Sequence, residues 1–320
     1  MFNSIRSASC AGARSYLWSE AILALVVGLL LVSGKIATAA EQKSFSTPGE
    51  AAAALVMAAQ NDDTTALALI LGKEAKEIIS SGDPVADNNA RDNFVAKYKQ
   101  MHRLAYDDQG RVLLYVGADN WPFYVPLTKE NGSWIFDTSA GKDEMLRRRV
   151  GQNELFTIDV LKDLTEAQHD YADEDLDGSG VKQYAQKIQS TSGKHNGLYW
   201  PVAEGEPESP IGPLIAEATE EGYKTGASAP ISFHGYYYKI LTRQGQGAAG
   251  GAKDYIKDGK MTDGFAFLAY PASYRASGVM TFMINQDGVL VQKDLGPDTA
   301  MLANEISGFN PDKTWDQDVD

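Results

Sequence analysis

The chain has 320 residues, of which 43% are hydrophobic and 22% are charged, and these proportions exclude a wholly disordered protein. The length suggests two domains rather than one. With 29 basic and 43 acidic residues the formal net charge is −14, which argues against nucleic-acid partners and against docking on anionic lipid.

The first 39 residues have the layout of a secretory signal peptide. Arg6 and Arg14 lie in a long N-terminal region, an apolar run covers residues 21–34, and Ala37–Ala39 supplies small residues for cleavage. A retained membrane anchor is the alternative, but the run ends at Lys35, short of the ~20 residues that a span needs. We therefore expect export to the periplasm, with secretion or attachment to the outer envelope left open, and no stable membrane span after cleavage.

Cleavage would leave 281 residues with 26 basic and 42 acidic side chains, a formal net charge of −16. The single cysteine, Cys10, would leave with the leader, so no disulfide can support the mature fold. A chain of this length can bury a sufficient core without one.

The mature chain is predicted to begin with helices followed by an antiparallel sheet. Thr47 can cap a helix that begins at Pro48, and Glu50 completes a capping box. A second short helix is predicted to end at Gly72, and a third runs from about Asp87 to Met101.

Three strands are predicted next, over Val112–Val116, Phe123–Leu127 and Trp134–Phe136, with a tight turn at Asn131–Gly132 before the third. Four aromatic residues are expected to share a hydrophobic face, with an aromatic ligand pocket as the alternative: Trp121, Phe123, Trp134 and Phe136.

One long helix is predicted from Lys142 to about Ala172. Its apolar stripe has helical spacing and consists of Leu155, Ile158, Leu161, Leu164, Gln168 and Tyr171. The run Arg147–Arg149 is interpreted as a solvated charged face, with a partner contact as the alternative.

The last part is predicted to form an antiparallel meander packed on the long helix. Its strands are Tyr236–Thr242, Phe265–Tyr270, Val279–Asn285 and Val289–Lys293. The expected class is therefore α+β, with a leader over residues 1–39, a first domain over 40–141 and a second over 142–320.

Seven blocks of this sequence carry a resemblance to a known family: Asp177–Val181, Gly197–Pro201, Phe233–Tyr237, Gly250–Tyr255, Gly278–Phe282, Asn285–Val289 and Asp294–Thr299. Together they resemble an exported bacterial family, domain-of-unknown-function family 2950. The resemblance covers essentially the whole mature chain and brings no established activity with it.

Two weaker resemblances concern the fold. Residues 45–140 are similar to the nuclear-transport-factor-like cone, in which helices are wrapped by a curved sheet and which hosts both enzymes and binding modules. The long helix and meander resemble the globular part of pilins and pseudopilins. The leader lacks a prepilin-type site and a soluble domain precedes the helix, so assembly into a pilus is not expected.

Asp173, Asp175 and Asp177, followed by Gly178, match the first half of a calcium loop. Alternate aspartates can converge on one hard cation where glycine allows a sharp turn. The second half of the segment departs from the calcium-loop pattern, because Tyr184 occupies the position of the glutamate that would bind calcium through both oxygens. The alternative is a solvated acidic loop, although carboxylates are poorly placed at a helix C-terminus. We therefore predict a candidate calcium site with a dissociation constant on the order of 10⁻⁴ to 10⁻³ M.

Signals for catalysis are weak, and no catalytic residue is predicted. The chain has no G-x-S-x-G elbow, and none of its four histidines has metal-pair spacing with another. His234 is interpreted as structural rather than as a general base, while Asp92 and His102 could line the interior of the cone. The loop Gly245–Gly251 lacks the lysine of a phosphate-binding loop and is interpreted as a flexible connection.

Together these features favour a non-enzymatic exported protein that binds or scaffolds an envelope protein or a small ligand, with calcium as the sole candidate cofactor. The alternative is a periplasmic, hydrolase-like enzyme that uses the N-terminal cavity. The interior of the first domain distinguishes the two functions. Carboxylate and histidine groups that face each other there would favour the enzyme, whereas an interior filled with apolar side chains would favour the binding module.

Overall fold

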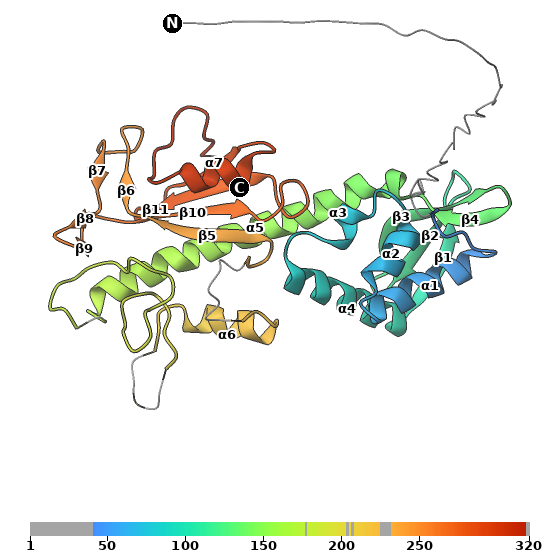
Figure 1. Ribbon diagram of the computed structural model, residues 1–320, viewed down its shortest axis with the longest axis horizontal. Helices are drawn as coiled ribbons and strands as arrows, with labels where there is room; N and C mark the ends of the chain where they lie inside the picture. The colour runs from blue at the N-terminus through green and yellow to red at the C-terminus, as the bar shows by residue number, and fades with distance from the viewer. Residues whose placement is uncertain (1–40, 177, 203–204, 206–207, 225–231, 318–320) are drawn as a thin grey trace, which may run out of the picture. The chain divides into compact units, whose positions relative to one another are not determined.

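A computed structural model describes residues 41–176, 178–202, 205, 208–224 and 232–317, so the predicted leader lies outside the described residues. The described residues all belong to one compact unit, Ala40–Asp320. They form helices and antiparallel sheets, which confirms the predicted α+β class (Figure 1). Among the described helices, none is both long and apolar enough to cross a lipid bilayer.

The first helix, α1 (Pro48–Gln60), begins where the sequence predicts. The Thr47 hydroxyl accepts a hydrogen bond from the Glu50 amide at 3.1 Å, and the Glu50 carboxylate accepts one from the Ser46 amide at 3.0 Å. These bonds satisfy amides that the first helical turn leaves without partners.

Three more helices precede the first sheet: α2 (Thr64–Leu71), α3 (Lys76–Ile79) and α4 (Pro84–Gln100). The helix α4 begins three residues before the predicted Asp87. Asp83 caps it and Pro84 occupies its first position, where the missing amide hydrogen has no cost.

The first sheet contains four antiparallel strands in the order β1-β2-β3-β4. They are β1 (His102–Tyr106), β2 (Val112–Val116), β3 (Trp121–Glu130) and β4 (Ser133–Phe136). The helices and this sheet enclose one apolar core. All four aromatic residues of the predicted shared face lie in this core or pack against it: Trp121, Phe123, Trp134 and Phe136.

The long helix α5 runs from Thr138 to Asp173, which makes it about 54 Å long. It starts before the predicted Lys142 because Asp137 caps it through the Ala140 amide, at 3.1 Å. Its first turns pack against β3 and its later turns against the second sheet, so it contributes to both halves. The helix crosses the predicted domain boundary near Gly141 without a break, and that boundary stays a prediction.

The predicted stripe of α5 is buried at Ile158, Leu161, Leu164, Gln168 and Tyr171. Leu155 was assigned to the same stripe, and this assignment is wrong: its side chain is 59% exposed.

The arginine run on α5 divides into two parts. Arg147 and Arg148 are exposed and pair with Glu144, as a solvated face predicts. Arg149 instead donates to the backbone carbonyl oxygens of Glu77, Ile78 and Ala276. Burial lowers the pKa of the Arg149 guanidinium below its ordinary value.

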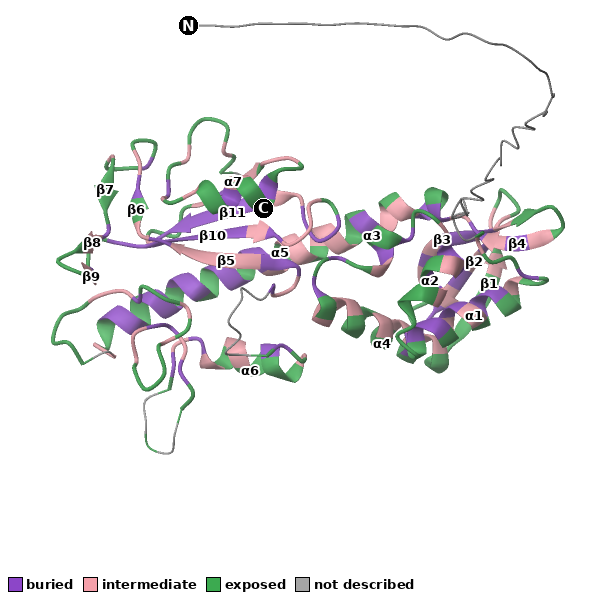
Figure 2. Ribbon diagram, viewed as in Figure 1, coloured by how far each residue is buried: buried purple, intermediate pink, exposed green. Residues whose placement is uncertain are grey.

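The second sheet has the order β12-β11-β10-β5 and is antiparallel. Its strands, β5 (Tyr236–Leu241), β10 (Ala266–Pro271), β11 (Met280–Asn285) and β12 (Leu290–Asp294), match the predicted meander to within about two residues. Figure 2 shows buried residues concentrated in the strands of both sheets and in patches along α5.

Shorter elements surround the second sheet. Two small hairpins separate β5 from β10: β6 (Arg243–Gln244) with β7 (Lys253–Asp254), and β8 (Ile256–Lys257) with β9 (Lys260–Met261). The helix α6 (Gly212–Glu220) precedes the sheet, and α7 (Thr299–Glu305) follows it and contacts β10.

Candidate functional site

A depression of about 790 Å³ lies beside the second sheet, where the chain after β12 meets the first small hairpin. Its wall includes β6, β7, the end of β12, α7 and the segment after it. We call it the C-terminal pocket, and it is lined by Arg243, Gln244, Gly245, Ala252, Lys253, Asp254, Met283, Lys293, Leu295, Leu302, Glu305, Ile306, Ser307, Gly308, Asn310 and Trp315.

The strand β6 is held on both sides, which fixes one wall of the pocket. It pairs with β7 through Arg243 opposite Asp254. On its other side, the Phe309 amide donates to the Arg243 carbonyl oxygen and the Gly245 amide donates to the Phe309 carbonyl oxygen, both at 2.9 Å. The Arg243 side chain also donates to the Ser307 hydroxyl.

The glycine-rich loop after β6, interpreted from the sequence as a flexible connection, is mostly exposed but makes close contacts at Gly245 and Gly247. An ideal Cβ at Gly245 would lie 2.3 Å from the Asn310 side chain, and the Gly247 amide donates to Asn310 Oδ1 at 2.8 Å. The buried Gln244 side chain closes the loop by donating to the carbonyl oxygens of Ala249 and Gly251. The glycines therefore allow close backbone approach.

The opposite wall depends on the pairing of the C-terminal segment with β12. Gln292 and Asp316 exchange two backbone hydrogen bonds, of 2.8 and 2.9 Å, along the outer edge of that strand. This pairing positions Trp315, whose ring centroid lies 5.9 Å from Lys293 Nζ. Lys253 Nζ lies 5.6 Å from the centroid of the Tyr255 ring.

The charges of the C-terminal pocket differ from those of the whole chain. Three cationic side chains line it, Arg243, Lys253 and Lys293, against two carboxylates. None of the three forms an ion pair with a carboxylate in the part of the chain that the structure describes. The pocket is thus a locally cationic place on an acidic protein.

The predicted calcium residues are only partly described. Asp173 Oδ1 lies 2.9 Å from Lys182 Nζ, and this hydrogen bond lowers the pKa of the Asp173 carboxyl. The Asp175 carboxylate accepts from the amides of Ser179 and Gly180, at 3.1 and 2.9 Å. Asp177 lies outside the described residues. Among the residues that are described, no group of three acidic, histidine or cysteine side chains gathers as a metal site.

The two residues proposed to line the cone interior do not lie there. Asp92 and His102 are exposed, and the His102 ring stacks on Tyr98 at a centroid distance of 3.8 Å. The space between the helices and the first sheet is occupied by apolar side chains that include Leu55, Leu114 and Phe136.

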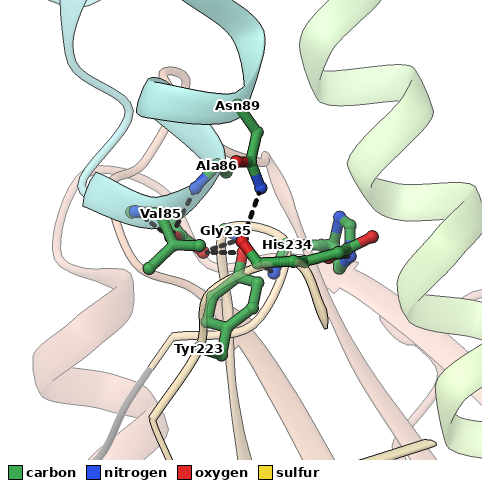
Figure 3. A network of polar contacts seen from close by, with 8 residues as sticks. Val85, Ala86, Asn89, Tyr223, His234 and Gly235 are labelled. Carbon is green, nitrogen blue, oxygen red and sulfur yellow. Dashed lines mark hydrogen bonds and ion pairs between the residues drawn. The ribbon is translucent and has the colours of Figure 1, made fainter. Parts of the chain in front are cut away.

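A buried polar cluster, which we call the Asp83 junction, connects α4 to the start of β5 (Figure 3). Asp83 is fully buried. One of its oxygens accepts from the amides of Val85 and Ala86, at 3.2 and 3.1 Å. The other accepts from the Tyr223 hydroxyl at 3.0 Å and from the Gly235 amide at 2.9 Å.

His234 belongs to the edge of this junction. Its amide donates to the Tyr223 hydroxyl at 3.1 Å, and burial raises the pKa of Tyr223 above its ordinary value. His234 Nε2 lies 2.8 Å from Glu221 Oε2, at ion-pair distance but without hydrogen-bond geometry. The ring packs on Phe156 with centroids 3.8 Å apart. These fixed partners agree with a structural role for His234.

The architecture defines an α+β protein with a cationic pocket on its second sheet. Residues 42–318 match the family described as protein of unknown function (DUF2950). The match covers more than half of the chain, so the chain belongs to this family. No curated protein and no solved structure matches it.

Sequence reasoning missed the C-terminal pocket entirely. Its residues come from six separate stretches of the chain between positions 243 and 315, and no short motif joins them. The only local signals were two lysines near aromatic residues, Lys253 before Tyr255 and Lys293 in the strand that later pairs near Trp315. Neither pair of residues predicts a pocket unless the fold is already known.

Proposed function

We propose that this protein is an exported, non-enzymatic binding or scaffolding module of the cell envelope. The observation that carries the proposal is the C-terminal pocket, which combines unpaired cations with an aromatic ring and apolar walls. Such a mixture of apolar surface and a few polar groups is typical of sites that hold small ligands.

The N-terminal half supports binding rather than catalysis. An enzyme of the alternative kind needs acid and base groups that face each other across an accessible interior. The described interior instead holds apolar side chains, and Asp92 and His102 lie on the surface.

The experiment for this proposal is recovery of the protein from its native envelope under mild conditions, followed by mass spectrometry of the small molecules and proteins that accompany it. We expect a stoichiometric small molecule or envelope protein that is lost from the triple variant Arg243→Gln, Lys253→Gln, Lys293→Gln. Recovery of identical material with the variant, or turnover of envelope substrates by the pure protein, would contradict the proposal.

Export predicts cleavage of the leader after Ala39. N-terminal sequencing of protein from a native host should therefore give a chain that begins at Ala40 or Glu41. Replacing Ala37 and Ala39 with bulky residues should block processing and leave the precursor in the membrane fraction. An intact Met1 on mature, functional protein would show that the segment is retained.

The aspartate motif predicts weak stabilisation by calcium. Calcium would have to displace Lys182 from Asp173, so we place the dissociation constant in the millimolar range. Calcium at ten times that constant should add about 1.4 kcal/mol to the free energy of unfolding, since it would bind the folded state alone.

Thermal melts with calcium, with magnesium and with a chelator test this prediction. The double variant Asp175→Asn, Asp177→Asn should lose the response to calcium. Equal melting temperatures of the unmodified protein in calcium and in chelator would reduce the motif to a solvated acidic loop.

A further inference from the structure

We infer that the C-terminal pocket binds a monoanionic carboxylate that carries a flat or apolar body. This inference rests on the proposed binding function and names the ligand class for the same site. It begins from Arg243, whose guanidinium donates to the Ser307 hydroxyl and has no carboxylate partner among the described residues. A guanidinium presents a fork of donors that matches the two oxygens of a carboxylate.

The position of Arg243 is fixed by its surroundings. An ideal Cβ at Gly308 would lie 2.8 Å from Arg243 Cγ and 2.9 Å from its carbonyl oxygen, so only glycine leaves room for the stem of the side chain. Backbone hydrogen bonds to β7 on one side and to Phe309 on the other fix the main chain at Arg243. Arg243 is exposed, so its guanidinium is accessible to an anion, while the confined stem reduces the freedom that the side chain loses on binding.

The charge balance selects a monoanion. Among the lining side chains, Arg243, Lys253 and Lys293 supply three positive charges, and Asp254 and Glu305 supply two negative ones. The Asp312 carboxylate outside the lining also interacts with Lys293, so the excess of positive charge is at most one. A carboxylate carries the single charge that balances this set. A phosphate monoester carries a charge close to −2 at pH 7, and the two carboxylates would repel it more strongly.

The apolar part of the ligand has a matching surface. Trp315 is half-buried beside Lys293, and the half-buried Leu295 and Leu302 add aliphatic area, whereas the lining Met283 is already buried. A ring or an apolar side chain lying on the indole would remove this area from water. Asn310 and Ser307 offer polar atoms at the rim for hydroxyl or amide groups.

The test is a titration of the full mature chain, followed by NMR of the tryptophan indole groups. Trp315 is assigned by the loss of its signal in Trp315→Phe. The probes are phenylacetate, its neutral analogue phenylacetamide and the dianion phenyl phosphate. We expect phenylacetate to shift the Trp315 signal at millimolar concentration. Phenylacetamide should bind at least about tenfold more weakly, as loss of one charge-assisted hydrogen bond implies. Phenyl phosphate should also bind more weakly than phenylacetate, because Asp254 and Glu305 repel its second negative charge.

Variants assign the effect to the arginine. Arg243→Gln should weaken phenylacetate binding by about tenfold or more, and Arg243→Lys should retain part of the affinity, because it keeps the charge and loses the fork. The matched control is Arg147→Gln, which removes one exposed cation on α5 and should leave binding unchanged. Unchanged melting temperatures would exclude misfolding as the cause.

A second series identifies the natural source of the carboxylate. N-acetylmuramic acid represents an acidic sugar, and an acetylated dipeptide represents a peptide C-terminus, each compared with its amide. Equal binding of acid and amide would overturn the carboxylate class and leave the binding function standing. If no probe shifts the Trp315 signal at concentrations up to 50 times the expected dissociation constant, the C-terminal pocket is not the binding site. The recovery of bound molecules from the native envelope would then test the proposed function independently.

Discussion

Replacing Gly141 with alanine is expected to lower the free energy of unfolding by about 3 kcal/mol, although alanine is the better helix former. An ideal Cβ at this position would lie 2.2 Å from the Tyr124 carbonyl oxygen and 2.7 Å from Val125 Cα. Both are backbone atoms of β3 and cannot rotate aside. The helix α5 would therefore have to move away from the first sheet.

Gly151, ten residues or nearly three turns later in the same helix, supplies the matched control. No atom lies within 4 Å of its ideal Cβ, so Gly151→Ala should raise the free energy of unfolding by about 1 kcal/mol through helix propensity alone. Urea denaturation of both variants measures the two effects. A stabilising effect of Gly141→Ala would show that α5 does not pack this closely on β3.

Asp83→Ala is expected to lower the free energy of unfolding by about 3 kcal/mol or more, because the substitution leaves two buried and two half-buried donors without this acceptor. Those donors are the amides of Val85, Ala86 and Gly235 and the hydroxyl of Tyr223. Asp83→Asn keeps the shape and one acceptor oxygen, so its effect should be smaller.

Asp63 provides the comparison for Asp83, because it caps α2 through the Ala66 amide at 2.8 Å but lies exposed. Asp63→Ala should cost about 1 kcal/mol, the ordinary value for a cap. Denaturation of Asp83→Ala, Tyr223→Phe and the double variant would measure their coupling. An Asp83 effect no larger than that of Asp63, or strict additivity with Tyr223, would contradict the junction.

The sequence predicted those elements whose signals are local. The cap at Thr47, the spacing of Ile158 and Leu161, and the short apolar runs of the second sheet each depend on residues close together in the chain. These local patterns are sufficient for helix starts, buried stripes and meanders.

The features that sequence reasoning missed depend on distant contacts. The strand β1 has an almost wholly exposed pattern and shows no alternation, so only its pairing with β2 defines it. The burial of Arg149 requires carbonyl groups more than 70 residues before it and more than 120 after it. The C-terminal pocket likewise consists of segments that are far apart in the sequence. The secondary-structure propensities of these segments do not predict that they come together.

The attachment of Arg149 has a consequence for how this sequence can vary. Its acceptors are backbone carbonyl oxygens of residues 77, 78 and 276, and every amino acid supplies such an oxygen. Substitution at these three positions therefore leaves the acceptors in place as long as the chain keeps its path. The Asp83 junction has the opposite property, since it needs a hydroxyl from Tyr223 and a carboxylate from Asp83 together. Residues 77, 78 and 276 can therefore be replaced without loss of the Arg149 hydrogen bonds. Asp83 and Tyr223, in contrast, can be replaced only together.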